Sequence, residues 1–408
     1  MKYITFVPLI GGMAIANNNI VGHKPEFVLS YNVFEKNESN LKNYWPDVKW
    51  YLLDETTNTL SEKLDFNDID FVSSVCPCAG MSALNMANRS ADNKTNNWLY
   101  KVAEFTLSTI KPKVYWGENA PGLYSDDNEK VLNKLREYGE KYGYSFTIYK
   151  TDTTLHGIPQ RRIRTFFFFW KNSNCPIINW YNHPGPPFEK YILDKNVGAS
   201  CENFSEKNPA ELYPEMDWIM KTYCNNSYDE YIKFFYKEFD ERSIRTPYDF
   251  IRCHNLWEEY KAWLEKDSRK DKPISDQGKR TPWYYLNYRF DKVKNNLGFF
   301  AMQPQVYKGT THAIISKNMF WTLHPVEQRF LNTREILSMM GMPSDFVLIS
   351  KNLQHVTQNV PVNTAQDMTR EVIKFINGEL KISNSKFIKQ NNIRQEIDYQ
   401  ELSSVKLF

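Results

Sequence analysis

Short apolar runs of strand length alternate with longer helical segments over the first 170 residues. The helix candidate Trp98–Ile110 carries Leu99, Val102, Phe105 and Ile110 at helical spacing, and Asn128–Tyr142 is a second one. This alternation predicts an α/β fold with a mostly parallel sheet covered by helices on both faces. The strand candidates are Tyr3–Val7, Glu26–Tyr31, Phe71–Val75, Val114–Glu118, Ser145–Tyr149 and Thr165–Trp170.

The alternation stops near Lys171, where a segment rich in Tyr, Trp, Lys and Arg begins. We therefore expect a first domain part over 1–170, a second, smaller and irregular domain over 171–320, and a return to the first domain over 321–380. Residues 381–408 are expected to form a polar tail that frays. Further helices are predicted at Tyr228–Glu241, at Leu256–Asp267, from Asn332 with Thr333 as its cap, and at Thr364–Leu380.

Composition limits the kind of protein that this chain forms. Of its 408 residues 41% are hydrophobic, which supports packed cores, and the net charge is only +3. Any nucleic-acid binding must then come from a local basic face. The six cysteines are scattered without a CxxC pair, so no metal site is predicted. We expect an intracellular, cytoplasmic protein with reduced thiols and no membrane span.

A thiol and a carboxylate each follow a predicted strand, at the edge where parallel sheets bind ligands. Cys78 lies in Cys76-Pro77-Cys78, and a thiolate there would be a nucleophile; the competing interpretation is a buried core thiol. Glu118 ends an apolar run, where a carboxylate needs either a function or a partner. It would either hold a substrate ring or pair with an arginine.

Two arginines stand at the start of the most apolar predicted strand. Arg162 and Arg164 share one side of this strand, with Ile163 on the other. The following residues, Phe166 to Trp170, predict a buried strand. A solvated basic edge is therefore less favoured than two fixed guanidinium groups that bind a base oxygen and a neighbouring carboxylate.

With these residues, the chain resembles the DNA cytosine-C5 methyltransferases. The most specific match is the run Gly157 to Arg164, and the resemblance covers the first 170 residues and about 320–380. It implies a Rossmann-like catalytic domain that acts on a flipped-out cytosine in double-stranded DNA. By this resemblance Cys78 is the nucleophile that attacks C6, Glu118 holds the base, Arg162 and Arg164 are the arginine pair, and 171–320 is the target-recognition domain.

The same resemblance implies S-adenosylmethionine as methyl donor. On the motifs that match, the donor-binding residues are Gly11, Gly12, Phe34, Asp54 and Asn359. Phe34 would stack on adenine, and Asp54 would either take the adenine amine or be a loop aspartate.

The match has four departures from the family pattern. Val7 replaces an aromatic residue, Pro8 a glycine, Val33 the acidic residue that holds the ribose, and Ala79 the glutamine after the Pro-Cys pair. Glu35, two places after Val33, is either the substitute acid or a surface charge.

Several functions remain open on the sequence. The leading one is S-adenosylmethionine-dependent methylation of cytosine C5 by a monomer on DNA. The departures in the donor region also allow another one-carbon donor, for example hydroxymethylation from a folate, or a non-catalytic DNA-binding relative. An RNA-modifying relative is disfavoured, because the insert of about 150 residues offers the large surface that reading base edges requires.

Overall fold

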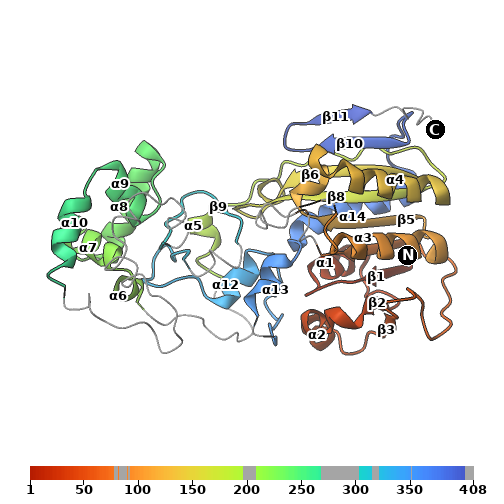
Figure 1. Cartoon of the computed structure of the whole chain (residues 1–408), viewed down its shortest axis with the longest axis horizontal. Coiled ribbons are helices and arrows are strands. Elements are labelled where there is room, and N and C mark those ends of the chain that lie inside the picture. The colour runs from red at the N-terminus through yellow and green to blue at the C-terminus, as the bar shows by residue number, and fades with distance from the viewer. Residues whose placement is uncertain are drawn as a thin grey trace. The chain divides into compact units, whose positions relative to one another are not determined.

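The structure is a computed structural model that describes residues 1–77, 81, 90, 92–195, 208–267, 303–314, 321–350 and 352–399. The chain forms two compact units (Figure 1). The first joins Met1–Gly185 to Met339–Phe408, and the second is Pro186–Ser338. The boundaries that the sequence suggests, near 170 and 320, lie 15 to 18 residues before those of the structure.

The first unit is built on a sheet whose described strands run in the order β11-β10-β6-β8-β5-β4-β1-β2-β3. Five of them, from β3 to β5 in that order, are parallel, whereas β8 runs antiparallel between β5 and β6. The predicted mostly parallel α/β sheet is thus confirmed. The strands are β1 (Tyr3–Phe6), β2 (Val28–Tyr31), β3 (Trp50–Leu53), β4 (Phe71–Val75), β5 (Val114–Asn119), β6 (Tyr144–Asp152), β8 (Ile163–Lys171), β10 (Phe387–Asn391) and β11 (Glu396–Tyr399), with the short β7 (Gln160–Arg161) outside this sheet.

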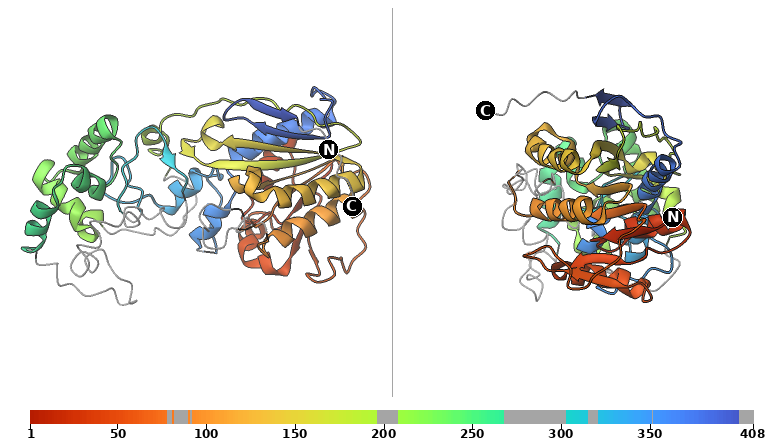
Figure 2. Two further views of the ribbon diagram at one scale, coloured as in Figure 1. Left: turned by 45° about the horizontal axis from the view of Figure 1, so that its top comes forward. Right: turned by 90° about the vertical axis from the view of Figure 1, so that its right-hand side faces the viewer.

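Helices cover both faces of this sheet. In Figure 2, α3 and α4 lie together on one face and α14 lies on the other, where it packs along α1. The buried side-chain amide of Asn17 links α1 and α14 to the sheet. Asn17 on α1 donates to Ser73 on β4 and accepts from Thr369 on α14. The helices of this unit are α1 (Gly12–Val21), α2 (Glu35–Tyr44), α3 (Asn96–Phe105, continued by a π-helical turn Thr106–Ile110), α4 (Glu129–Tyr142), α13 (Leu353–Gln358) and α14 (Val362–Ile376).

The segment expected to be a frayed tail instead extends the sheet. β10 pairs in parallel with β6, and β11 pairs antiparallel with β10. Although β10 is largely polar, Phe387 and Ile388 are buried, and the Gln390 side chain donates to the backbone oxygen of Ile178 and accepts from its N–H. The expectation of a frayed segment over 387–399 is therefore wrong, because strand pairing satisfies polar groups that in a coil would face water.

The second unit is mainly helical in its described part. An aromatic-rich core that includes Trp218, Tyr231, Phe235, Tyr248 and Tyr260 holds its helices together. The helices predicted around 228–241, 256–267 and 332 are present. The cap of the last of these is Asn332, whose Oδ1 accepts from the Glu335 N–H at 2.8 Å, so the prediction of Thr333 as the cap is wrong: Thr333 is the first residue of the helix itself. The elements are α5 (Phe188–Tyr191), α6 (Pro209–Leu212), α7 (Pro214–Tyr223), α8 (Tyr228–Arg242), α9 (Pro247–Cys253), α10 (Trp257–Leu264), β9 (Thr311–His312) and α12 (Thr333–Ser338).

Candidate active site

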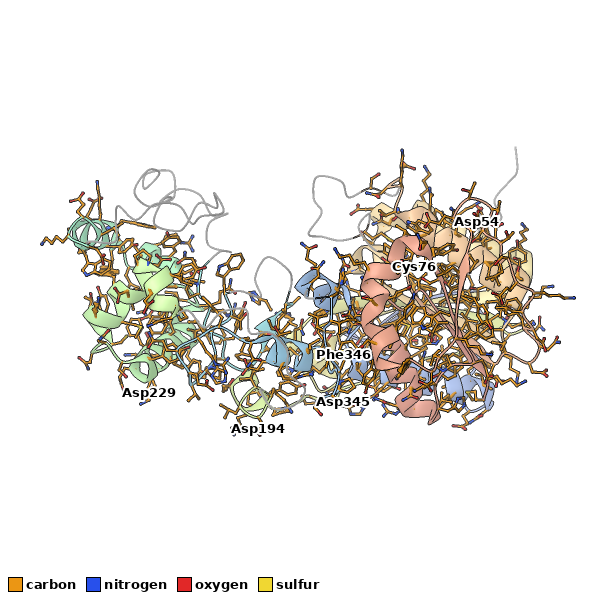
Figure 3. The ribbon with its side chains drawn as sticks, turned by 90° about the horizontal axis from the view of Figure 1, so that it is seen from below. Asp54, Cys76, Asp194, Asp229, Asp345 and Phe346 are labelled. Atoms are coloured by element: carbon orange, nitrogen blue, oxygen red, sulfur yellow. The ribbon has the colours of Figure 1, made fainter. Side chains whose placement is uncertain are left out.

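The carboxyl ends of five parallel strands meet at one edge of the sheet. The chain leaves these ends at Val7, Asn32, Asp54, Cys76 and Ala120, after β1, β2, β3, β4 and β5 in turn. Asp54 and Cys76, the first residues after β3 and β4, are labelled in Figure 3. Open α/β sheets bind their ligands beyond these ends. Most of the residues predicted from sequence therefore lie along this edge.

Glu118, near the end of β5, is a buried carboxyl group held by an arginine. Its side chain is 5% exposed, and Oε1 lies 2.6 Å from Nε of Arg164 on β8. Burial raises the pKa of Glu118, and the positive charges of Arg164 and then Arg162 oppose this effect. The predicted partner of the carboxylate is thus present. A carboxyl group with a raised pKa at a strand end is also suited to bind a ring nitrogen through a proton.

Arg162 has different partners from Arg164. It is 1% exposed, and Nη2 donates to the backbone oxygens of Thr357 and, at 3.2 Å, of Asn359. The neighbouring Gln160 similarly donates to the backbone oxygen of Met339 at 2.6 Å. The motif therefore fixes the returning C-terminal segment with Gln160 and Arg162, while Arg164 holds Glu118.

Of the two cysteines in the Cys76-Pro77-Cys78 motif, the structure describes only Cys76. Cys78, the predicted nucleophile, lies outside the residues that the structure describes. Cys76 is buried, with Sγ 4.0 Å from the Ser74 hydroxyl and 3.9 Å from the Trp98 backbone oxygen. Burial raises the pKa of the Cys76 thiol to about 12. Because the thiolate is the reactive form, Cys76 is a packing residue at neutral pH.

The turn after β1 combines unusual backbone conformations with close packing. Val7 and Leu9 have φ of 48° and 53°, a region that branched and bulky side chains rarely adopt. A Cβ on Gly12 would lie 2.2 Å from the backbone oxygen of Val360, so only glycine fits there. Gly11 has φ 106° and precedes α1. These positions bring the N-terminus of α1 against the C-terminal segment.

Asn359 makes that contact. Its Oδ1 accepts from the Gly12 N–H at 2.9 Å, and its Nδ2 lies 3.1 Å from Sδ of Met342. The structure thus gives the side-chain amide of Asn359 a role in joining the C-terminal segment to α1. Together with Arg162, which directly precedes β8 and donates to the backbone oxygen of Asn359, it connects the start of β8 to the start of α1.

The other predicted donor residues lie at the ends of β2 and β3. Phe34 packs its ring edge-on against Trp98, with ring centroids 5.2 Å apart. Asp54 is exposed, and Oδ1 accepts from the N–H groups of Thr56 and Thr57 at 2.9 and 2.7 Å, which forms a turn. Hydrogen bonds to Thr57 and Thr56 lower the pKa of Asp54. These contacts give Oδ1 of Asp54 local partners within its own turn.

One acidic residue at this edge was not found from the sequence. Glu55 Oε1 accepts from the backbone N–H of Val33 at 2.9 Å. Val33 itself is 55% exposed. The only sequence signal for Glu55 is its position next to Asp54, because the contact joins residues 22 positions apart that follow two different strands, β2 and β3.

Fold and site together define an α/β enzyme whose chemistry lies at the carboxyl edge of a mostly parallel sheet. Among the described residues, no group of three or more His, Cys, Asp or Glu is placed to hold a metal ion. Over the same ranges, no helix is both long and apolar enough to cross a membrane.

Comparison with known proteins identifies the family. Residues 9–374 match the model of the C-5 cytosine-specific DNA methylases. The chain therefore belongs to this family, and it is a DNA cytosine-C5 methyltransferase. The chain is 22% identical over 397 residues to the type II methyltransferase M1.HphI of Haemophilus parahaemolyticus, covering 93% of this chain and 88% of that protein.

Two further similarities agree with this assignment. The type II methyltransferase M.Bpa9945I of Bacillus paralicheniformis is 22% identical over 336 residues, which cover 76% of this chain and 71% of that protein. Among solved structures, a prophage-encoded E. coli protein described as a DNA modification methyltransferase has a TM-score of 0.51 at 13% identity. That comparison covers 92% of this chain and 99% of the other, and it supports the fold.

Proposed function

We propose that this enzyme methylates C5 of a cytosine in double-stranded DNA with S-adenosylmethionine as donor and Cys78 as nucleophile. The observation that carries the proposal is the buried Glu118–Arg164 pair at the end of β5, the strand beside β4. The chain reaches Cys78 three residues after β4 ends at Val75. A base held by Glu118 would thus be bound next to the strand that leads to the thiol.

Glu118 has the properties needed to activate a cytosine ring. C6 of cytosine becomes electrophilic when N3 receives a proton or a strong hydrogen bond, and the raised pKa of Glu118 favours the protonated carboxyl group that donates it. Arg164 orients this group by holding Oε1. The thiolate of Cys78 adds to C6, and the electron pair of the C5–C6 double bond then makes C5 a nucleophile.

The residues at the carboxyl edge of the sheet fit S-adenosylmethionine, because they offer aromatic rings for its adenine and carboxylates for its polar groups. Phe34, beyond the end of β2, and the half-buried Trp98 against it provide aromatic surface, and Asp54 and Glu55 provide carboxylate oxygens beyond the end of the neighbouring β3. The donor supplies a methyl group bound to a positively charged sulfur. Carboxylates and rings are suited to bind this cation and its nucleoside.

The second unit is the proposed target-recognition domain. It occupies the position of the sequence insert, between the two chain segments that form the first unit. Its aromatic core supports a folded module of its own. Reading base edges requires a sizeable surface of this kind in addition to the catalytic unit.

Labelled S-adenosylmethionine and cytosine-containing duplex DNA provide the test. The wild type should transfer label to DNA and form a covalent adduct with duplex DNA that carries 5-fluorocytosine. Cys78→Ala should abolish both. Cys76→Ala, the matched control two residues away, should retain both because its thiol is buried and protonated.

Nucleoside mass spectrometry of the modified DNA distinguishes the alternatives. 5-Methylcytosine is the expected product. A different C5 substituent would show another one-carbon donor, and DNA binding without an adduct at any sequence would show a non-catalytic relative. Either result would refute the proposal, as would transfer of label to RNA in place of DNA.

A further inference from the structure

Just beyond the end of β2, the chain has a valine at a position where an acidic residue would bind a ribose. In doubly wound sheets, an Asp or Glu about 20 residues after the glycine turn accepts hydrogen bonds from a ribose. Counting from Gly11 and Gly12, this position is Val33, whose exposed side chain has no polar group. A ribose bound here would thus find no acceptor on the side chain of residue 33.

The carboxylate of Glu55 occupies the space beside this backbone. Glu55 follows β3, the strand that pairs with β2, and its Oε1 lies 2.9 Å from the Val33 nitrogen. Tyr31 and Leu53 are register partners at the ends of the two strands. Val33 and Glu55 each lie two residues beyond these partners, so their backbones start from neighbouring points of the edge.

The turn that carries Glu55 is held in place by several contacts. Lys101 donates to the backbone oxygen of Glu55. Asn58, at φ 57°, accepts from the Tyr31 hydroxyl at 2.6 Å and donates to the Lys101 backbone oxygen at 3.0 Å. The carboxylate of Asp54 also holds the turn, because it accepts from the backbone N–H groups of Thr56 and Thr57. A carboxylate that is fixed in advance loses little freedom when it binds a ligand.

The other acids near this strand end are less suited to the role. Glu35, in the first turn of α2, is exposed, and within the described part of the chain its carboxylate is not held by a hydrogen bond or an ion pair. Glu38 is fully buried and accepts from the Ser30 hydroxyl, so it faces the interior. Glu55 alone of these three is both held at Val33 and reachable from solvent.

From these contacts we infer that Glu55 replaces the missing acid of β2 and accepts the hydrogen bonds of the donor's ribose hydroxyls. This inference rests on the proposed use of S-adenosylmethionine. One oxygen of Glu55 stays on the Val33 N–H while the carboxylate faces the ribose. The acid is supplied by β3 instead of β2.

Binding of S-adenosylhomocysteine to the full chain, followed by calorimetry, tests the assignment without turnover. Glu55→Gln keeps an oxygen for the Val33 N–H but loses the charge, so the dissociation constant should rise about 10- to 100-fold. Glu35→Gln, at the competing position, and Glu62→Gln, an exposed residue of the same loop, should leave it within about twofold. Adding Val33→Glu to Glu55→Gln should restore tight binding.

A ligand pair separates ribose recognition from folding. The wild type should bind S-adenosylhomocysteine more tightly than its 2′,3′-dideoxy analogue, and Glu55→Gln should lose this preference even if its overall affinity or stability falls. An unchanged preference in Glu55→Gln, or its loss in Glu35→Gln, would overturn the assignment of Glu55. Failure of the wild type to bind either ligand would instead refute the proposed donor.

Discussion

Glu38 and Ser30 form a buried pair between α2 and β2, under the edge that carries the proposed donor site. Oε1 of Glu38 accepts from the Ser30 hydroxyl at 2.6 Å. Burial raises the pKa of Glu38 to about 8, against smaller opposing effects of Ser30 and Lys42. Hence the folded protein holds a proton on this carboxyl group at neutral pH, although the unfolded chain does not.

This proton makes stability depend on pH in a defined direction. The pKa of Glu38 is higher in the folded state, so its contribution is fully present below about pH 4.3 and is lost as the pH rises toward 8. Glu38→Gln removes this dependence. Its free energy of unfolding relative to wild type should increase between pH 5 and 8, by at most about 1.4 kcal/mol per pH unit.

Urea unfolding at several pH values measures the effect. Glu35→Gln, an exposed acid of the same helix, should give a curve parallel to the wild type. A Glu38→Gln curve that is also parallel would show that Glu38 is ionised in the folded protein.

At the scale of elements, one amide ties two helices to the sheet. Asn17 on α1 donates to the Ser73 hydroxyl at 2.7 Å and accepts from the Thr369 hydroxyl at 2.9 Å, and all three side chains are buried. Asn17→Ala removes both bonds and leaves Ser73 without this donor. We expect a loss of about 2 kcal/mol in the free energy of unfolding.

Denaturant unfolding of Asn17→Ala and Asn19→Ala tests this role. Asn19 lies on the same helix and is exposed, so its substitution should change stability by less than about 0.5 kcal/mol. Equal effects of the two substitutions would mean that the buried amide does not hold α1 in place.

The strands that the sequence predicts have clear apolar runs, whereas the unpredicted helix α1 has no strong helix-forming pattern. The six predicted strands are present as β1, β2, β4, β5, β6 and β8. The helix α1 was not predicted, because its run Asn17 to Asn19 consists of poor helix formers. Contacts with α14 and β4 stabilise it instead. Helix propensity depends only on nearby residues, so it cannot predict a helix that is stabilised by a segment about 350 residues away in the sequence.

At the scale of the whole molecule, the C-terminal strands complete the edge of the sheet. β10 pairs with β6 through five register positions, from Phe387 opposite Phe146 to Asn391 opposite Lys150. Phe387 also lies under the guanidinium of Arg136 on α4, 4.4 Å from its ring centre. Without β10, the long strand β6 becomes an exposed edge.

A pair of truncated chains tests the contribution of these strands. A chain that ends at Ser385 should have a lower melting temperature and a greater tendency to aggregate than one that ends at Tyr399, because it lacks both β10 and β11. Thermal unfolding and light scattering measure the two effects. Equal behaviour of the two chains would show that the pairing adds nothing to stability.

By itself, the sequence determined the family, the mostly parallel sheet and the order of Cys78, Glu118, Arg162 and Arg164. These features depend on residue type and on spacing along the chain. Tertiary structure decided which groups meet and which are buried. It pairs Arg164 with Glu118, directs Arg162 to the C-terminal segment, and raises the pKa of Cys76.

The position of Glu55 illustrates the physical reason. Nothing in the residues around Val33 or Glu55 indicates that they meet, since β2 and β3 join only through the sheet register. Burial and pairing are properties of segments brought together in space. The sequence therefore gives the chemical groups of the site, while the packing of strand ends determines their partners and their charge.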